Sequence, residues 1–381
     1  MKVFVVDPSL FTRTYDQGLA RGLAGAGADV TLIGRPLRRA ESLDTRGYRF
    51  LPMFYRLAET GEDELGRARL ALKGAEHVLG LARLRALVAR ERPDIVHVQW
   101  LTLPFLDGRL WRSLARRMPV LHTAHNSVAF HNRPSSVLQL VGHGEALRGF
   151  THYIAHTEPT AQHLVAAGIG RERITVLPRP ASEFAAKAGP RPAALRDDAV
   201  RILLFGALKP YKGIDLLVEA GLALARRRRD FQIVVAGRPG FDLAPLQARV
   251  AAAGAGDCFV FDLRFLPDEA MAAHIDAADL VVFPYREFDT SAALTVAAKR
   301  GRAIVASAVG MFADPAIAAS LRLIPPGDAA VLERTLEELV DDPAERARLA
   351  ARAPQLEDAL LAWPDFARAN LEVYRRLLAA R

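Results

Sequence analysis

Short apolar runs alternate with amphipathic stretches along most of the chain. The runs are rich in Val, Ile, Leu and Phe at successive positions, which is typical of strands buried on both faces of a parallel sheet. The stretches between them carry apolar residues at helical spacing. This alternation predicts an α/β protein. The predicted strands cover residues 3–6, 30–33, 93–100, 120–126, 153–155, 174–177, 202–205, 231–236, 259–261, 280–283 and 303–306.

The alternation is interrupted once, at residues 178–198. This segment holds four prolines, one glycine and charges of both signs, a composition typical of a linker. The strand and helix pattern then restarts. We therefore predict two domains with separate parallel sheets, over residues 1–180 and 195–360. A last helix, over about residues 365–381, is expected to cross back onto the first domain.

The composition narrows the class of protein. The chain of 381 residues is 51% hydrophobic and 25% charged, which is typical of a soluble globular protein. The single cysteine, Cys258, excludes an intramolecular disulfide and fits a reducing cytoplasm. The net charge of +8 favours anionic partners such as nucleic acid, acidic lipid or phosphorylated substrates. Zinc-finger and RNA-recognition signatures are absent from the sequence, so we expect no nucleic acid.

The stretch 201–220, RILLFGALKPYKGIDLLVEA, reads as a strand, a turn and a helix. Gly206 permits a tight turn after the strand. Lys209 and Lys212 follow, directly before the helix, whose free N-terminal amides attract anions. The sequence therefore predicts a phosphate site here. The alternative is an ordinary turn with two solvated lysines.

Later turns of the second half carry further candidates. Arg238 follows the next strand and could join the lysines around a diphosphate. Thr290 and Ser291 stand where the cap of helix 292–300 is expected, so free amides there would also face an anion. Glu287 or Asp289 could accept hydrogen bonds from sugar hydroxyls.

In the first half, His125 and Asn126 end a strand, a position from which polar side chains reach a ligand in such folds. The first strand is followed by DPSLF instead of a glycine-rich motif, which argues against a dinucleotide site. Several other histidines match no metal-binding spacing, and we expect no metal. These histidines are His131, His143, His152, His156 and His163.

A long basic helix is predicted over residues 64–92. We expect its arginines to form one basic surface with those of residues 110–118, with Trp111 and leucines beside them, on anionic lipid headgroups. The alternative is a solvated basic face. The arginines are Arg83, Arg85, Arg90, Arg116 and Arg117.

Several of these segments together resemble the GT-B glycosyltransferases, close to retaining family 4. The matching text includes FGALKPYKGIDLLVEA, VVAGRPG, DLRFLPDEAMAAHIDAADLVVFPY and IPPGDAA in the second half, and PDIVHVQW and HTAHN in the first. The resemblance implies two Rossmann-like domains that face a central cleft. It also implies an acceptor site in the first domain and a nucleotide-sugar site in the second.

The resemblance also implies roles for single residues. Lys212 matches the lysine on the donor diphosphate, and Lys209 takes the charge of the usual arginine, which is Ala207 here. His125 matches the histidine beside the donor sugar, and Glu287 falls near the first of the family's two paired glutamates. The second glutamate is replaced by Val296.

Two mechanisms stay open at this point. An inverting enzyme needs a base, for which His125 and Asp16 are candidates. In a retaining enzyme His125 would contact the sugar instead. Arg13, Tyr15 and Asn126 are expected to bind the acceptor.

The resemblance thus implies transfer of a sugar, with GDP-mannose as the first candidate donor, to a lipid-linked saccharide. The reaction would occur at the cytoplasmic face of the cell membrane, in bacterial exopolysaccharide or cell-surface glycan synthesis, without a metal cofactor. The PYKG and PYR segments resemble the xanthan-type β-mannosyltransferase. A catalytically degenerate sugar-nucleotide-binding subunit, or a sugar epimerase or phosphorylase, is the alternative.

Overall fold

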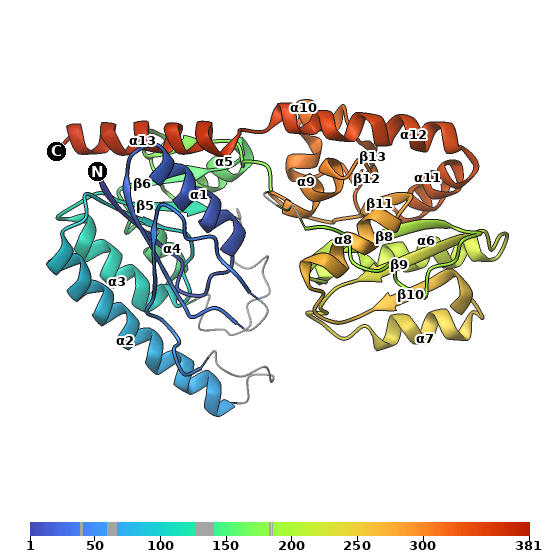
Figure 1. The fold of residues 1–381 in the computed structure, drawn as a ribbon, viewed down its shortest axis with the longest axis horizontal. Helices are drawn as coiled ribbons and strands as arrows, with labels where there is room; N and C mark the ends of the chain where they lie inside the picture. The colour runs from blue at the N-terminus through green and yellow to red at the C-terminus, as the bar shows by residue number, and fades with distance from the viewer. Residues whose placement is uncertain (39–40, 59–66, 126–140, 183, 185) are drawn as a thin grey trace. The chain divides into compact units, whose positions relative to one another are not determined.

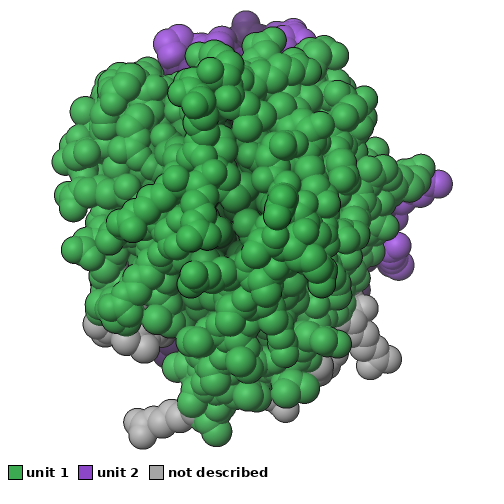
Figure 2. Space-filling view, turned by 90° about the vertical axis from the view of Figure 1, so that its left-hand side faces the viewer, with its two compact units in different colours: residues 1–183, 361–381 green, residues 184–360 purple. Residues whose placement is uncertain are grey.

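The computed structural model spans residues 1–381 and describes all of them except 39–40, 59–66, 126–140, 183 and 185. The chain divides into two compact units (Figure 2). The first unit comprises Met1–Glu183 and Leu361–Arg381, and the second comprises Phe184–Leu360. Each unit has its own parallel β-sheet, so the predicted α/β class with two parallel sheets is confirmed (Figure 1).

The described residues of the first unit form a seven-stranded sheet in the order β3-β2-β1-β4-β5-β6-β7. All neighbouring strands run parallel. The strands are β1 (Lys2–Val6), β2 (Asp29–Gly34), β3 (Arg49–Pro52), β4 (Ile95–Val98), β5 (Val120–Ala124), β6 (His152–Ala155) and β7 (Ile174–Val176).

Helices cover both faces of this sheet because successive strand side chains point to opposite sides. Phe4 and Val6 of β1 pack with α2 (Arg67–Glu91) and α3 (Pro104–Ala115). Val3 and Val5 pack on the other side, with α1 (Arg13–Gly25) and α13 (Trp363–Ala379). Two short helices, α4 (His143–Leu147) and α5 (Glu158–Ala166), complete the unit.

The last helix, α13, packs closely on α1 because α1 has glycines on the contact side. A Cβ atom on Gly18 would lie 2.4 Å from the Trp363 ring, and one on Gly22 would lie 2.8 Å from the Ala367 Cβ. The Tyr374 hydroxyl also bonds His97 Nδ1 at 2.6 Å. The C-terminal helix therefore belongs to the first unit.

The second unit holds a parallel sheet of six described strands in the order β10-β9-β8-β11-β12-β13. The strands are β8 (Val200–Phe205), β9 (Phe231–Ala236), β10 (Phe259–Asp262), β11 (Leu280–Phe283), β12 (Ala303–Ser307) and β13 (Arg322–Ile324). The helices are α6 (Ile214–Ala225), α7 (Ala244–Ala252), α8 (Asp268–Ala277), α9 (Ala292–Lys299), α10 (Pro315–Ala318), α11 (Ala329–Asp341) and α12 (Pro343–Arg352).

Alternate residues of β8 enter two separate cores. Ile202 and Leu204 pack with α6, α7 and α11, whereas Leu203 and Phe205 pack with α8 and α9. In both sheets the first strand in sequence, β1 or β8, lies between its two later neighbours. Ligands of such folds bind outside the carboxyl ends of the strands at this switch in strand order.

Three details differ from the sequence predictions. Helix α1 begins at Arg13 instead of about residue 19, so Tyr15 and Asp16 lie in its first turns. The short strands β3 and β13 were not predicted. The expected exposure of Trp111 is wrong, because its ring is 1% exposed and stacks near Phe150 in the core.

Candidate active site

Lys212 lies at the switch point of the second sheet, in the single turn Pro210–Lys212 that follows β8. It is only 6% exposed. Its Nζ donates to the Phe205 carbonyl at 3.2 Å and lies 5.4 Å from the centroid of the Tyr285 ring. Burial, and then the charge of Lys209, lower the pKa of Lys212 to about 7. Within the described chain no carboxylate forms an ion pair with Lys212.

Glycines allow this turn to lie close to its neighbours. Gly206 has φ +97° and a Cβ atom there would lie 3.3 Å from Lys212 Nζ. Gly213 has φ +66°, and a Cβ atom there would lie 2.0 Å from the Pro284 carbonyl oxygen. Both conformations disfavour side chains. The glycines therefore hold Lys212 between the ends of β8 and β11.

The turn after β9 lies against the same turn. A Cβ atom on Gly237 would lie 2.0 Å from the Gly206 carbonyl oxygen. Leu208 N donates to the Arg238 carbonyl at 2.9 Å, and Gly240 N donates to the Leu208 carbonyl at 2.7 Å. The exposed side chains of Lys209 and Arg238 thus extend from two turns in contact. Burial lowers the pKa of Lys209.

The loop between β11 and α9 completes this edge. Ser291 caps α9, since its Oγ accepts from Leu294 N at 3.2 Å. Its own amide donates to the Met311 sulfur at 3.0 Å, so this amide is not free for an anion. Thr290 is half-buried beside it. Glu287 is exposed in the same loop.

Val296 lies on the inward side of α9, within the apolar core. The neighbouring Thr295 donates from its hydroxyl to the Ala292 carbonyl at 2.9 Å. This turn of the helix therefore offers no carboxylate to a ligand.

The first sheet carries a pair of carboxyl groups at its own switch point. Asp7 follows β1 and accepts from Ser9 N at 3.1 Å and from Thr12 N at 3.2 Å. Asp16 is fully buried and accepts from the Thr12 hydroxyl at 3.2 Å. Burial and the charge of Asp7 raise the pKa of Asp16 well above its usual value. Burial raises the pKa of Asp7 as well.

His125 follows β5 and is buried. Its Nε2 donates to Gln99 Oε1 at 3.1 Å, and its Nδ1 has no partner in the described structure. The Trp100 ring stacks on it, with centroids 5.2 Å apart and an interplanar angle of 11°. Burial and then His156 lower the pKa of His125 well below its usual value. The imidazole is thus neutral at pH 7 and presents a lone pair.

His156 and Tyr15 lie beside His125. The Tyr15 ring is 4.8 Å from that of His125 and 5.4 Å from that of His156. His156 Nδ1 donates to the Leu177 carbonyl at 3.0 Å, and its Nε2 has no partner among the described residues. The Arg179 guanidinium lies 5.3 Å from the centroid of the Tyr15 ring.

Sequence reasoning gave no role to Gln99, His156 or Arg179. The available signal was their position, because each follows a strand of the first sheet. Arg13 donates to the Ser42 carbonyl, so its guanidinium is directed to that loop. Asn126 lies outside the described residues.

In the parts of the chain that the structure describes, no three His, Cys, Asp or Glu side chains gather where they could hold a metal ion. Over the same residues no helix is both long and apolar enough to cross a membrane.

Two α/β units with polar groups at both sheet edges are the architecture of GT-B glycosyltransferases. Residues 12–180 match the family described as "Glycosyl transferase 4-like domain", and residues 199–342 match "Glycosyl transferases group 1". The chain belongs to the glycosyltransferases that combine these two domains, and it is a transferase.

Curated relatives carry related names. The D-inositol 3-phosphate glycosyltransferase of Frankia alni is 30% identical over 318 residues, which is 75% of each chain. The enzyme of that name from Geodermatophilus obscurus is 32% identical over 57% of this chain, and this chain spans about half (52%) of its length. The 2-deoxystreptamine glucosyltransferase of Streptomyces kanamyceticus is 31% identical over 63% of this chain and 67% of its own.

Solved structures share the fold. Sucrose-phosphate synthase from Thermosynechococcus elongatus superposes with a TM-score of 0.75 at 20% identity, over 100% of this chain and 99% of its own. HepE from Anabaena, solved in complex with UDP-glucose, gives a TM-score of 0.68 at 17% identity over 99% of this chain and 100% of its own.

Proposed function

We propose that the protein transfers a sugar from a nucleoside-diphosphate sugar, bound by the second unit, to a saccharide acceptor bound by the first. Lys212 carries this proposal. A buried ammonium without an acidic partner is costly, and a diphosphate would supply the missing negative charge. Lys212 lies at the switch in strand order between β8 and β11. Sheets of this kind bind ligands at such a switch.

The proposed chemistry follows from the charge of the leaving group. Breaking the bond between sugar and diphosphate leaves extra negative charge on the nucleotide. Lys212, with Lys209 and Arg238 on the adjoining turns, would stabilise that charge from fixed positions. We therefore propose that no metal ion is needed. Thr290 and Glu287, in the loop before α9, would contact the donor from the other side.

His125 is proposed to contact the reacting sugar. Its Nδ1 lone pair can accept a hydrogen bond from a hydroxyl, but its lowered pKa makes it a weak base. Asp16 is fully buried and accepts from the Thr12 hydroxyl, so it is a weaker candidate for the base than the sequence suggested. These observations favour the retaining alternative, in which His125 holds the sugar.

The donor and acceptor are proposed at the level of class. GDP-mannose, from the resemblance to the xanthan-type enzyme, and UDP-glucose, from the HepE complex, are the donors to test first. The names of the relatives point to cyclitol acceptors, whereas the basic surface points to a lipid-linked saccharide. We propose the lipid-linked saccharide, in bacterial exopolysaccharide or cell-surface glycan synthesis.

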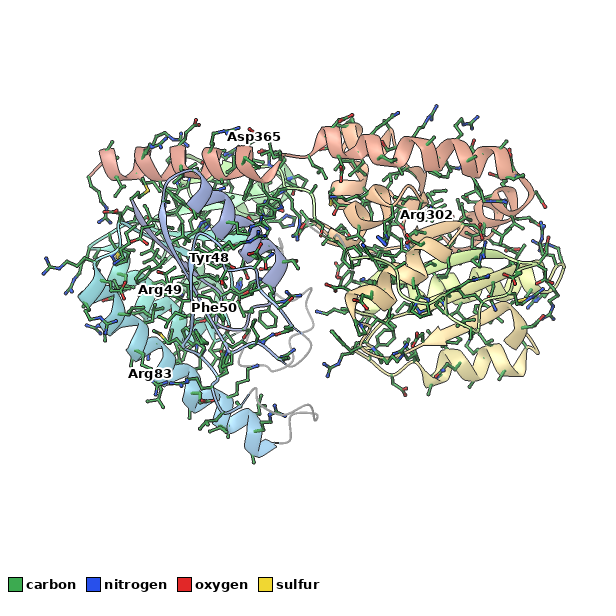
Figure 3. All side chains as sticks on the ribbon, viewed as in Figure 1. Tyr48, Arg49, Phe50, Arg83, Arg302 and Asp365 are labelled. Atoms are coloured by element: carbon green, nitrogen blue, oxygen red, sulfur yellow. The ribbon has the colours of Figure 1, made fainter. Side chains whose placement is uncertain are left out.

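The membrane proposal is supported by helix α2. Its exposed residues include Leu72, Val78 and Leu79 among alanines, followed by Arg83 and Arg85. Figure 3 shows Arg83 on this helix. Within the described residues neither arginine forms an ion pair with an acid. An apolar stripe flanked by free cations fits an anionic lipid surface. We propose that this side of α2 lies on the cytoplasmic face of the membrane.

Two surface arginines of the second unit, Arg227 and Arg228, differ because acidic side chains neutralise them. Arg227 pairs with Glu333 at 2.7 Å and Glu337 at 3.0 Å, and Arg228 pairs with Asp230 at 2.7 Å and Asp341 at 2.6 Å. Paired charges attract a lipid surface less. The second unit therefore provides controls for the first.

Calorimetric titration with UDP, GDP and their sugars tests the donor site. Binding of a diphosphate should raise the pKa of Lys212 from about 7, so at pH 8 the complex should take up about one proton. Titrations in two buffers of different ionisation enthalpy measure this uptake. Binding without uptake would place the diphosphate away from Lys212.

Sugar release separates the alternatives. An active transferase should slowly hydrolyse its donor without acceptor, whereas a degenerate binding subunit should bind the nucleotide and release no sugar. Nucleotide binding with no release from any donor would favour the binding subunit.

A further inference from the structure

An exposed phenylalanine lies beside the buried cluster of the first unit. The Phe11 side chain is 53% exposed. Its ring and that of Trp100 form a T-shaped pair, with centroids 5.5 Å apart and an interplanar angle of 65°. Trp100 in turn stacks on His125, and its Nε1 donates to the Thr12 hydroxyl at 3.0 Å. Phe11 and Trp100 together are called the aromatic platform below.

The turn before Phe11 fixes the position of the Phe11 backbone. Leu10 has φ +47° yet is buried, a strained conformation for a residue with a side chain. Such strain persists only where surrounding contacts fix it. Here the Asp7 carbonyl accepts from Leu10 N at 3.2 Å, and the Asp7 carboxyl group holds the amides of Ser9 and Thr12. The exposed ring of Phe11 therefore belongs to a loop whose backbone is held by these hydrogen bonds.

Unpartnered polar atoms lie in the cluster beneath the platform. His125 Nδ1 and His156 Nε2 can accept hydrogen bonds, and Gln99 Nε2 can donate them, yet within the described structure none of the three has a partner. Buried polar atoms without partners are uncommon and mark places where a ligand or water completes the network. Hydroxyl groups suit all three, because each both donates and accepts.

The cluster contains ionisable groups of both signs. Arg179 is the cation that the described residues place against Tyr15. Asp7 and Asp16 are the buried carboxyl groups on the same side of the sheet, and burial raises the pKa of both. The histidines are neutral at pH 7, because burial lowers the pKa of His156 to about 3 and that of His125 well below its usual value. A phosphorylated ligand gains little in such a site.

We propose that the aromatic platform binds the C–H face of an uncharged pyranose ring of the acceptor, while His156 accepts a hydrogen bond from one of its hydroxyls. The electron-rich face of an aromatic ring attracts the polarised C–H groups of a sugar. This inference rests on the proposed transferase function and names the acceptor class. It favours a neutral sugar over the phosphorylated cyclitol that the relatives' names suggest.

Tryptophan fluorescence of the full chain provides a readout independent of turnover, since Trp100 belongs to the platform. The probes are methyl β-D-glucopyranoside, methyl β-D-galactopyranoside, methyl α-D-mannopyranoside, octyl β-D-glucopyranoside and D-glucose 6-phosphate. At least one neutral methyl pyranoside should change the emission saturably. The phosphorylated sugar should bind no more tightly than methyl glucoside.

Variants of Phe11 assign the binding to the platform. Loss of ring stacking in Phe11→Ala should weaken binding about tenfold, whereas Phe11→Tyr should stay within about twofold. The control is Phe105→Ala. Phe105 is 48% exposed in the same unit, but the Arg109 guanidinium already covers its ring at 4.3 Å. This variant should bind like the wild type.

Three outcomes would overturn the proposal: no response to any neutral pyranoside, equal weakening in Phe11→Ala and Phe105→Ala, or tighter binding of the phosphorylated sugar. Preference for octyl over methyl glucoside that disappears in Phe11→Ala would assign the platform to a lipid chain instead. Donor hydrolysis separates this inference from the proposed function. Phe105→Ala should hydrolyse the donor at the wild-type rate, whereas absence of hydrolysis in both the wild type and Phe105→Ala would count against the transferase itself.

Discussion

The carboxyl ends of the two sheets lie at equivalent switch points in strand order, but they differ in charge. At the edge of the second sheet, Lys212 is buried without an acid, beside exposed Lys209. At the carboxyl ends of the first sheet, the cation Arg179 lies near the buried carboxyl groups Asp7 and Asp16, and burial raises the pKa of both carboxyl groups. An edge with excess positive charge suits a diphosphate, and one with groups of both signs suits a neutral polyol. The comparison indicates which unit would hold which substrate.

Removing the charge of Lys212 should have the largest effect, because it removes the buried cation that distinguishes the second unit. Lys212→Met keeps the aliphatic stem and deletes the ammonium. Loss of one partner of a desolvated charge pair costs about 2–5 kcal/mol, so turnover should fall by orders of magnitude. Part of that cost appears only as the leaving group gains charge, so nucleotide affinity should fall less. Initial rates and calorimetry measure the two effects.

When neither protein has a ligand bound, the Lys212→Met variant should be more stable than the wild type. The folded pKa of Lys212 is about 7 against an ordinary value of 10.5, so burying its charge destabilises the fold below pH 7. This penalty fades as pH rises from 7 to 10.5, at about 1.4 kcal/mol per pH unit. The melting-temperature gain of Lys212→Met should therefore shrink across that range. Lys299→Met, at an exposed lysine of the same unit, should change neither rate nor stability.

The carboxyl pair of the first unit gives an intermediate effect on stability. Asp7→Asn removes an oxygen that accepts from the Ser9 or Thr12 amide. Each unsatisfied buried amide costs about 1–3 kcal/mol of the free energy of unfolding. Asp16→Asn should cost less, because the amide keeps an oxygen that can accept from the Thr12 hydroxyl and carries no buried charge. Chemical denaturation of both variants at pH 7 measures the difference.

The pH profile of stability tests the raised pKa of Asp16 directly. A carboxyl group with a raised folded pKa stabilises the protein below its unfolded pKa, and this contribution is lost as pH rises through the folded value. Wild-type stability should therefore fall with rising pH relative to Asp16→Asn, which lacks that carboxyl group. Parallel profiles would show that the pKa of Asp16 is not raised.

Predictability from sequence differs between the two edges for a physical reason. The residues of the proposed donor site are close in sequence. Gly206, Lys209 and Lys212 lie within seven residues, so the stretch itself shows a strand, a turn and cations. The edge of the first sheet gathers Tyr15, His125 and His156 from distant segments, and only the register of the strands brings them together.

The layers of the fold followed from apolar periodicity, but three features did not. β3 and β13 are short outermost strands, each paired with a neighbour on one side only, and their apolar pattern is weak. Trp111 was expected on the surface because arginines adjoin it. A helix turns by about 100° per residue, however, so neighbouring residues can face opposite sides. The side of α3 that contains Trp111 packs in the core.

The smallest expected effect concerns the surfaces of the two units. Arg83→Gln and Arg85→Gln on α2 should each weaken binding to vesicles with acidic phospholipid about fivefold, since an arginine near an anionic surface contributes about 1 kcal/mol. Arg227→Gln in the second unit is the matched control, because Glu333 and Glu337 already neutralise it. Co-sedimentation at low and high salt measures the binding, which should weaken as salt screens the charges. Equal losses from all three variants would indicate that net charge alone, and not α2, attracts the membrane. Binding that ignores both salt and acidic lipid would rule out an electrostatic contact altogether.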